Sequence, residues 1–220
     1  MGGGGFAMEP ENLLLDHYML SLTGKPKPKV CFIGTASGDA QGYIDKFYAA
    51  YRTLDCIPSH LSLFLGTPQS VEQFILEQDL IHVGGGNTRN LLSLWREWKL
   101  DQILLKAYQQ GIVLSGMSAG MVCWFEQGMT DSFGPVLSNL DCLGWLPGSA
   151  CPEIDRRPTF IKQIQGGIIK GGLALDDGAG ALYWDGELKE CVSSRLLAKA
   201  THFEIQTANE TQMPIRFLGK

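Results

Sequence analysis

Ser118 lies at the centre of the pentapeptide Gly116-Met117-Ser118-Ala119-Gly120, where two glycines flank a serine. Apolar residues 112–114 precede this segment, and residues 121–125 resume a helical pattern. A strand, a G-x-S-x-G turn and a helix in this order form the pattern of a nucleophile elbow, whose glycines allow a sharp turn that exposes the serine hydroxyl. The pattern predicts nucleophilic attack by Ser118, which needs a neighbouring base. The alternative is an ordinary strand-to-helix turn whose glycines serve only close packing.

A second glycine-rich loop, Gly84-Gly85-Gly86-Asn87-Thr88, also separates a predicted strand from a predicted helix. It lacks the glycine spacing and the lysine of nucleotide-binding loops, which argues against a phosphate site. Glycines expose backbone N–H groups, so Gly85 and Gly86 are candidate oxyanion donors together with the N–H of Ala119. A tight turn without a ligand is the alternative.

The surrounding pattern alternates short apolar strands with amphipathic helices. Strands are predicted at 29–33, 61–65, 80–83 and 112–114, and helices at 43–54, 71–76, 87–98, 101–109 and 121–125. Residues 182–192 predict a hairpin around Asp185-Gly186, a strong two-residue turn signal. This order predicts an α/β fold with a mostly parallel sheet between two helical layers, ending in a C-terminal hairpin, as one domain over residues 1–220. The opening glycines, 2–5, are compatible with a sheet-edge loop, but a flexible terminus is the favoured interpretation.

The composition limits the classes of partner. Hydrophobic residues make up 45% of the 220 residues and the net charge is −5, with scattered Lys and Arg, which argues against nucleic acid or an anionic membrane as a partner. The six cysteines show no metal-ligand spacing, so we expect no metal and no cofactor, and free thiols of this kind fit a cytoplasmic protein. No segment has the length and character of a membrane span. The oligomeric state stays open, with a homodimer as one alternative.

Taken together, these motifs resemble the peptidase E and cyanophycinase group of serine peptidases (peptidase family S51). The similarity extends over nearly the whole chain and rests on residues 2–10, 35–37, 83–88, 116–120, 130–134, 143–147, 151–152 and 156–160. The resemblance implies a three-layer fold like that of class I glutamine amidotransferases (flavodoxin-like), with a Ser–His–Asp/Glu triad. It also implies small peptide substrates, because known members cleave dipeptides after an amino-terminal aspartate or degrade cyanophycin.

By position, the resemblance makes Ser118 the nucleophile and Asp131 the acidic triad member, and it places the oxyanion donors at Gly85, Gly86 and Ala119. From the sequence alone, a turn residue before Ser132 is the favoured interpretation of Asp131, and only the resemblance gives it a catalytic role. Asn87 and Arg157 are candidate substrate-binding residues, since an arginine can hold a carboxylate through two hydrogen bonds. The alternative for Arg157 is a surface arginine at the start of a helix.

The histidine that the resemblance implies is missing from its expected place. The chain has Cys151-Pro152-Glu153-Ile154-Asp155-Arg156-Arg157 there, a few residues shorter than the family pattern. Three explanations are open: a segment is absent from this sequence, Glu153 replaces the base, or the protein binds peptides without cleaving them. We favour the first, which an intact mass matching 220 residues would contradict. An esterase that uses His202 as its base is a further alternative.

Overall fold

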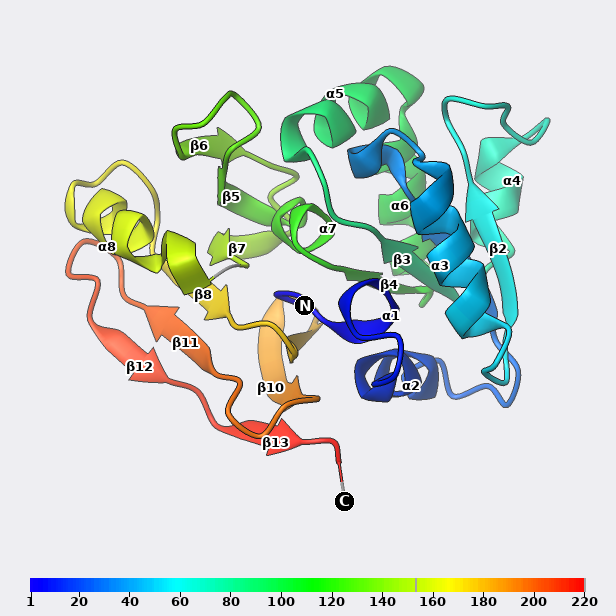
Figure 1. Cartoon of the computed structure of the whole chain (residues 1–220). Helices are drawn as coiled ribbons and strands as arrows, with labels where there is room; N and C mark the ends of the chain where they lie inside the picture. The colour runs from blue at the N-terminus through cyan, green and yellow to red at the C-terminus, as the bar shows by residue number, and fades with distance from the viewer. Residues whose placement is uncertain (153, 220) are drawn as a thin grey trace.

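The four parallel strands that precede the Ser118 turn form one sheet. The computed structural model describes residues 1–152 and 154–219, and in it β1 (Lys29–Ile33), β2 (Ile57–Leu61), β3 (Leu80–Val83) and β4 (Val113–Gly116) are ordered β2-β1-β3-β4 (Figure 1). Every pair in this sheet is parallel. The carboxyl ends of β3 and β4 therefore lie side by side, and the two glycine-rich turns that follow them meet.

Alternating side chains of the sheet face two helical layers. Val30 and Phe32 of β1 pack against α1 (Gly5–Met8), α2 (Leu14–Ser21) and α3 (Gln41–Tyr51). Cys31 and Ile33 join the opposite core, with α4 (Val71–Leu76), α5 (Thr88–Trp98), α6 (Leu100–Gln109) and the short α7 (Ala119–Val122). The predicted α/β three-layer arrangement is thereby confirmed.

The rest of the chain builds two further sheets beside the first (Figure 1). One has the order β12-β11-β8-β7-β5-β6 and is covered by α8 (Arg157–Gln165), with strands at Phe125–Thr130 (β5), Ser138–Asp141 (β6), Leu146–Cys151 (β7), Gly172–Leu175 (β8), Ala200–Phe203 (β11) and Glu210–Gln212 (β12). The other joins β9 (Ala179–Trp184), β10 (Glu187–Ser193) and β13 (Ile215–Phe217). β9 and β10 form the predicted hairpin, and positive φ angles at Asp185 and Gly186 match its turn.

Two predicted elements are misplaced. The second strand covers 57–61 instead of 61–65, because the backbone N–H groups of Leu63 and Phe64 donate to the buried carboxylate of Asp39, at 2.7 and 3.2 Å, and leave the sheet. The helix after Ser118 begins at Ala119 and ends at Val122, since Phe125 already starts β5. Apolar composition alone does not separate such short segments.

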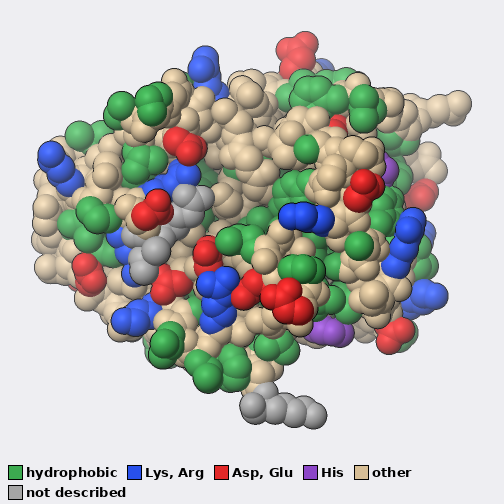
Figure 2. Space-filling model, in the orientation of Figure 1, with side chains coloured by type: hydrophobic (Ala, Val, Ile, Leu, Met, Phe, Trp, Pro, Cys, Tyr) green, Lys and Arg blue, Asp and Glu red, His purple; other side chains and the backbone are tan. Residues whose placement is uncertain are grey.

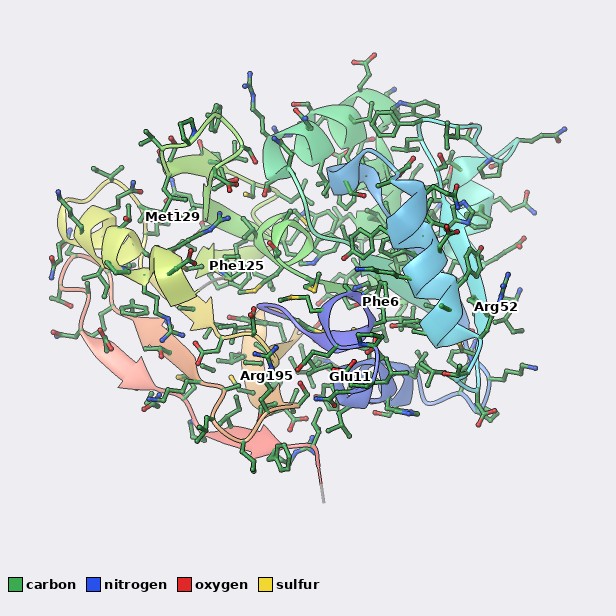
Figure 3. All side chains as sticks on the ribbon, in the orientation of Figure 1. Phe6, Glu11, Arg52, Phe125, Met129 and Arg195 are labelled. Atoms are coloured by element: carbon green, nitrogen blue, oxygen red, sulfur yellow. The ribbon has the colours of Figure 1, made fainter. Side chains whose placement is uncertain are left out.

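The prediction of a flexible amino-terminal glycine run is wrong. Gly2 to Phe6 are buried, Gly3 forms a parallel bridge with Asp177, and the Phe6 ring contacts the Phe32 and Phe47 rings at centroid distances of 5.7 and 5.6 Å. Figure 3 shows Phe6 on α1, between α2 and α3. The glycines are needed for this close approach, because a Cβ at Gly2 would lie 2.5 Å from the carbonyl oxygen of Asp176.

The cysteines of the chain are free thiols, and five of the six are buried. In the described ranges, none of the helices combines the length and apolar character needed to cross a bilayer.

Candidate active site

Ser118 has the backbone conformation of a residue on a strained turn. Its φ is 51° and its ψ is −113°, a combination that residues with a side chain rarely adopt. Such an outlier persists only where the surroundings hold it, and it is a common mark of functional sites. Here the Ser118 N–H donates to the carbonyl oxygens of Met1 and Gly2, each at 3.2 Å. The amino-terminal segment therefore supports the turn directly.

The two glycines that flank Ser118 are required by close backbone contacts. A Cβ at Gly116 would lie 1.9 Å from the carbonyl oxygen of Gly120, and a Cβ at Gly120 would lie 2.2 Å from that of Val83 in β3. Both distances are far below van der Waals contact. The pentapeptide therefore has the pattern G-x-S-x-G because α7 packs directly on the ends of β3 and β4.

The second glycine loop lies against the serine. A Cβ at Gly85 would be 3.3 Å from the Cβ of Ser118, and Gly86, with φ of 140°, passes so close to Ala36 that a Cβ would lie 2.2 Å from its carbonyl oxygen. The N–H of Ala119 belongs to the first turn of α7, where amides have no partner within the helix. The Gly85 backbone and the start of α7 thus both lie near Ser118, and the Gly85 N–H itself donates to the Tyr43 hydroxyl at 3.3 Å.

Ser118 opens into a cavity of about 780 Å³, a size that suits a small-molecule or short-peptide ligand. Its lining comes from the amino-terminal segment, α3, the two glycine loops and the stretches around Asp155 and Asp177 (Gly2, Ala7, Met8, Gly42, Tyr43, Lys46, Gly85, Met117, Ser118, Asp155 and Asp177). Acidic and basic side chains lie close together on this face of the molecule (Figure 2). The cavity therefore combines a nucleophile position with charges of both signs.

Three charged groups in this lining lack a partner in the described part of the chain. Lys46, Asp155 and Asp177 make no ion pair and no side-chain hydrogen bond with any described residue. Because a charge in a cavity lining without a described protein partner is available to a ligand, these groups can bind opposite charges on a substrate.

Asp131, Asn87 and Arg157 make contacts elsewhere and do not appear in the cavity lining. Asp131 is exposed and accepts a hydrogen bond from Arg156 at 3.2 Å. Asn87 caps α5 through its side-chain oxygen, 2.8 Å from the Asn90 N–H, while its amide donates to the Ser132 carbonyl oxygen at 3.3 Å. Arg157 forms an ion pair with Asp176. The Asn87 contact ties the second glycine loop to the loop that carries Asp131.

The four histidines lie away from the cavity lining. His82 is buried in β3, where its Nδ1 lies 2.9 Å from the Ser115 hydroxyl and burial lowers its pKa to about 3. His60 contacts the Tyr48 hydroxyl at 2.9 Å, and His17 and His202 are exposed on α2 and β11. The alternative base considered from the sequence, Glu153, lies outside the described residues.

Several cavity residues were not predicted from the sequence: Met8, Tyr43, Lys46, Asp155 and Asp177. Tyr43 and Lys46 lie on the helix predicted at 43–54, and Met8 lies in the stretch 2–10, which was noted only for the resemblance. No local pattern distinguishes them, because they meet Ser118 only through the tertiary structure.

The amino-terminal wall of the cavity depends on a buried carboxylate. Asp16 is fully buried and accepts hydrogen bonds from the Phe6 N–H and the Tyr51 hydroxyl, both at 3.0 Å. Burial raises the pKa of Asp16 to about 6 from an ordinary value of 3.8, and the two hydrogen bonds offset part of this effect. The ionised form is thus destabilised by folding, although it holds α1 in place.

We expect Asp16→Asn to remove a pH-dependent loss of stability. Between about pH 4 and 6 the unfolded chain ionises Asp16 before the folded protein does, so the free energy of unfolding falls as the pH rises, by up to about 3 kcal/mol. Denaturant unfolding of both proteins at pH 4 and pH 7 measures this. The free energy of unfolding of the variant, relative to that of the wild type, should be higher at pH 7 than at pH 4. An equal difference between the two proteins at both pH values would contradict the expectation.

Comparisons with known proteins show the family of the chain. The sequence model of Peptidase family S51 matches residues 1–191. The chain is 50% identical to the uncharacterized peptidase YgaJ of Bacillus subtilis (strain 168) over 227 residues, covering 100% of this chain and 97% of the relative.

Two solved structures share the fold. One is a peptidase from an acI-B1 actinobacterium, with a TM-score of 0.68, 15% identity and coverage of 98% of this chain and 92% of that one. The other is a candidate peptidase E protein from Listeria monocytogenes EGD-e, with a TM-score of 0.57, 16% identity and coverage of 94% and 96%. With a family match over most of its length and a relative of this similarity, the chain is a peptidase that belongs to peptidase family S51.

Proposed function

We propose that this protein is a serine-type exopeptidase that cleaves dipeptides or short peptides with an acidic amino-terminal residue through an acyl-enzyme on Ser118. The observation that carries the proposal is the strained Ser118 turn in the lining of a cavity of peptide size. In this mechanism the Ser118 Oγ attacks the scissile carbonyl carbon, the C–N bond breaks as the amine leaves with a proton, and water hydrolyses the resulting ester.

The oxyanion of the tetrahedral intermediate would be held by the backbone amides of Gly86 and Ala119, while the Gly85 amide of the same loop donates to the Tyr43 hydroxyl at 3.3 Å. Support comes from the approach of Gly85 to the Ser118 side chain and from the position of Ala119 at the start of α7. Amides fixed in this way need no reorganisation when the negative charge develops, and each such donor contributes about 3 kcal/mol to transition-state stabilisation.

A base is still needed to take the Ser118 proton. We infer that it is a histidine of a segment that this sequence lacks near 151–157, oriented by Asp131, whose Arg156 partner belongs to the same stretch of chain. The alignment with YgaJ is seven positions longer than this chain, so the relative has residues without a counterpart here. None of the histidines, all of which the structure describes, lines the cavity. This supports a second candidate function, a peptide-binding protein without turnover. The histidine positions do not support an esterase using His202, which lies on β11 outside the cavity lining.

Labelling with a fluorophosphonate tests the nucleophile. The reagent should modify Ser118 in the wild-type protein, located by mass spectrometry of the digested chain, and Ser118→Ala should stay unmodified. A protein that hydrolyses dipeptides and yet shows no label on Ser118 would contradict the proposal. Binding of a dipeptide without labelling or turnover would instead support the second candidate.

The unpaired charges of the cavity suggest how a substrate is selected. A dipeptide with an amino-terminal acidic residue carries an ammonium group and a nearby side-chain carboxylate, and the cavity offers Asp155 and Asp177 to the first and Lys46 to the second. Hydrogen bonds between charged groups are the stronger class, at about 1.5–3 kcal/mol.

Lys46→Gln should therefore weaken the preference for an acidic residue. We expect kcat/KM for Asp-Leu to fall by about 10- to 100-fold while that for Asn-Leu changes little, since only the former loses a charge-assisted contact. Lys27→Gln, which removes the same charge at an exposed position outside the cavity, is the control. An equal fall for both substrates would assign Lys46 no part in selecting the side chain.

A further inference from the structure

Tyr43 is held with its hydroxyl beside the glycine loop of the cavity. Its ring packs on Phe32 and Phe6 at centroid distances of 4.9 and 5.7 Å. On another side, Gly84 leaves so little room that a Cβ there would lie 3.0 Å from the Tyr43 Cε1. Because α3 anchors one end of the side chain and these contacts surround the ring, the hydroxyl has a defined position.

The hydrogen bonding of this hydroxyl is incomplete. Tyr43 Oη accepts a hydrogen bond from the Gly85 N–H at 3.3 Å, while its own proton has no acceptor among the described residues. A phenol both donates and accepts, so the proton remains available to a ligand. Tyr43, Gly85 and Ser118 line the same cavity.

The hydroxyl also stays protonated at neutral pH. Burial raises the pKa of Tyr43 to about 12, the Coulombic effect of Asp16 adds to this, and the Gly85 hydrogen bond acts in the opposite direction. The protonated Tyr43 hydroxyl is polarised by the Gly85 N–H that donates to it. It can therefore donate a strong hydrogen bond to an oxygen on which negative charge develops.

We propose that Tyr43 is a catalytic residue whose hydroxyl donates a hydrogen bond to the oxyanion formed when Ser118 attacks a substrate carbonyl. The contribution of Gly85 then reaches the oxyanion through Tyr43, with Gly86 and Ala119 as the direct backbone donors. The proton stays on Tyr43 throughout, so no proton transfer has to be balanced. This inference rests on the proposed serine-peptidase function.

Tyr43→Phe tests the inference, with Tyr48→Phe as the matched control. Tyr48 lies on the same helix, and its hydroxyl contacts His60 outside the cavity. We expect Tyr43→Phe to lower kcat by about 10²-fold with little change in KM, as for the loss of one oxyanion donor, and the control to keep wild-type kinetics. The affinity of the aldehyde analogue of an acidic amino-terminal residue, whose adduct with Ser118 carries the oxyanion, should fall by a similar factor while the affinity of the free product amino acid is kept.

The aldehyde-to-product affinity ratio does not depend on how much of the variant is folded. An unchanged ratio would overturn the role of Tyr43, whether or not the thermal midpoint falls, and so would unchanged kcat in a wild-type protein that fluorophosphonate labels on Ser118. Absence of that label in the wild type would instead overturn the proposed function itself, so the two failures are distinguishable.

Discussion

Ser118→Ala should lower kcat for the best dipeptide substrate by a factor on the order of 10⁶, the effect of removing the nucleophile from a serine peptidase. The variant loses only one oxygen atom, and alanine can occupy the same strained conformation as serine. Its free energy of unfolding should therefore stay close to the wild-type value. The chemical step is lost because no other group can form the acyl-enzyme.

Two measurements complete this experiment. Steady-state turnover gives the loss of activity, and calorimetric titration with a dipeptide shows whether the cavity still binds its substrate. Ser21→Ala, at an exposed position on α2, is the control for expression and handling. Turnover of Ser118→Ala within tenfold of the wild type would remove Ser118 from the nucleophile position.

Gly120→Ala should destabilise the protein strongly. The added methyl group would lie 2.2 Å from the carbonyl oxygen of Val83 and 2.9 Å from the Val83 Cβ, so α7 would have to move away from β3. Overpacking at a buried backbone contact of this kind belongs to the large end of mutational effects, and we expect a loss of about 3–5 kcal/mol. Because α7 begins directly after Ser118, the nucleophile turn should shift with it.

Gly42→Ala provides the comparison. Gly42 is on α3 with open space around the position of a Cβ, so alanine should stabilise the helix, by up to about 1 kcal/mol. Denaturant unfolding of both variants measures the difference. A loss below about 1 kcal/mol in Gly120→Ala would show that the contact between α7 and β3 relaxes easily, and the steric account of the second motif glycine would then be wrong.

The strand–helix alternation was predictable because its elements depend on local pattern. Apolar periodicity and glycine turns place four of the early elements correctly, the strands at 29–33 and 80–83 and the helices at 71–76 and 88–98. Prediction failed for the strand expected at 61–65. There the carboxylate of Asp39, distant in sequence, accepts hydrogen bonds from the backbone N–H groups of Leu63 and Phe64. It failed again at the amino-terminal glycines, whose burial depends on partners near Asp177.

By itself, the sequence determined the α/β architecture, the family and the position of Ser118 between a strand and a helix, because these rest on periodicity and on glycines whose spacing is local. Only the tertiary structure decided what surrounds Ser118. It brings Gly85 against the serine, seats the Tyr43 hydroxyl on the Gly85 amide, and places Lys46 and Asp177 in one cavity from elements more than a hundred residues apart. Such neighbours are selected by parallel strand pairing and core packing, which no short stretch of sequence records.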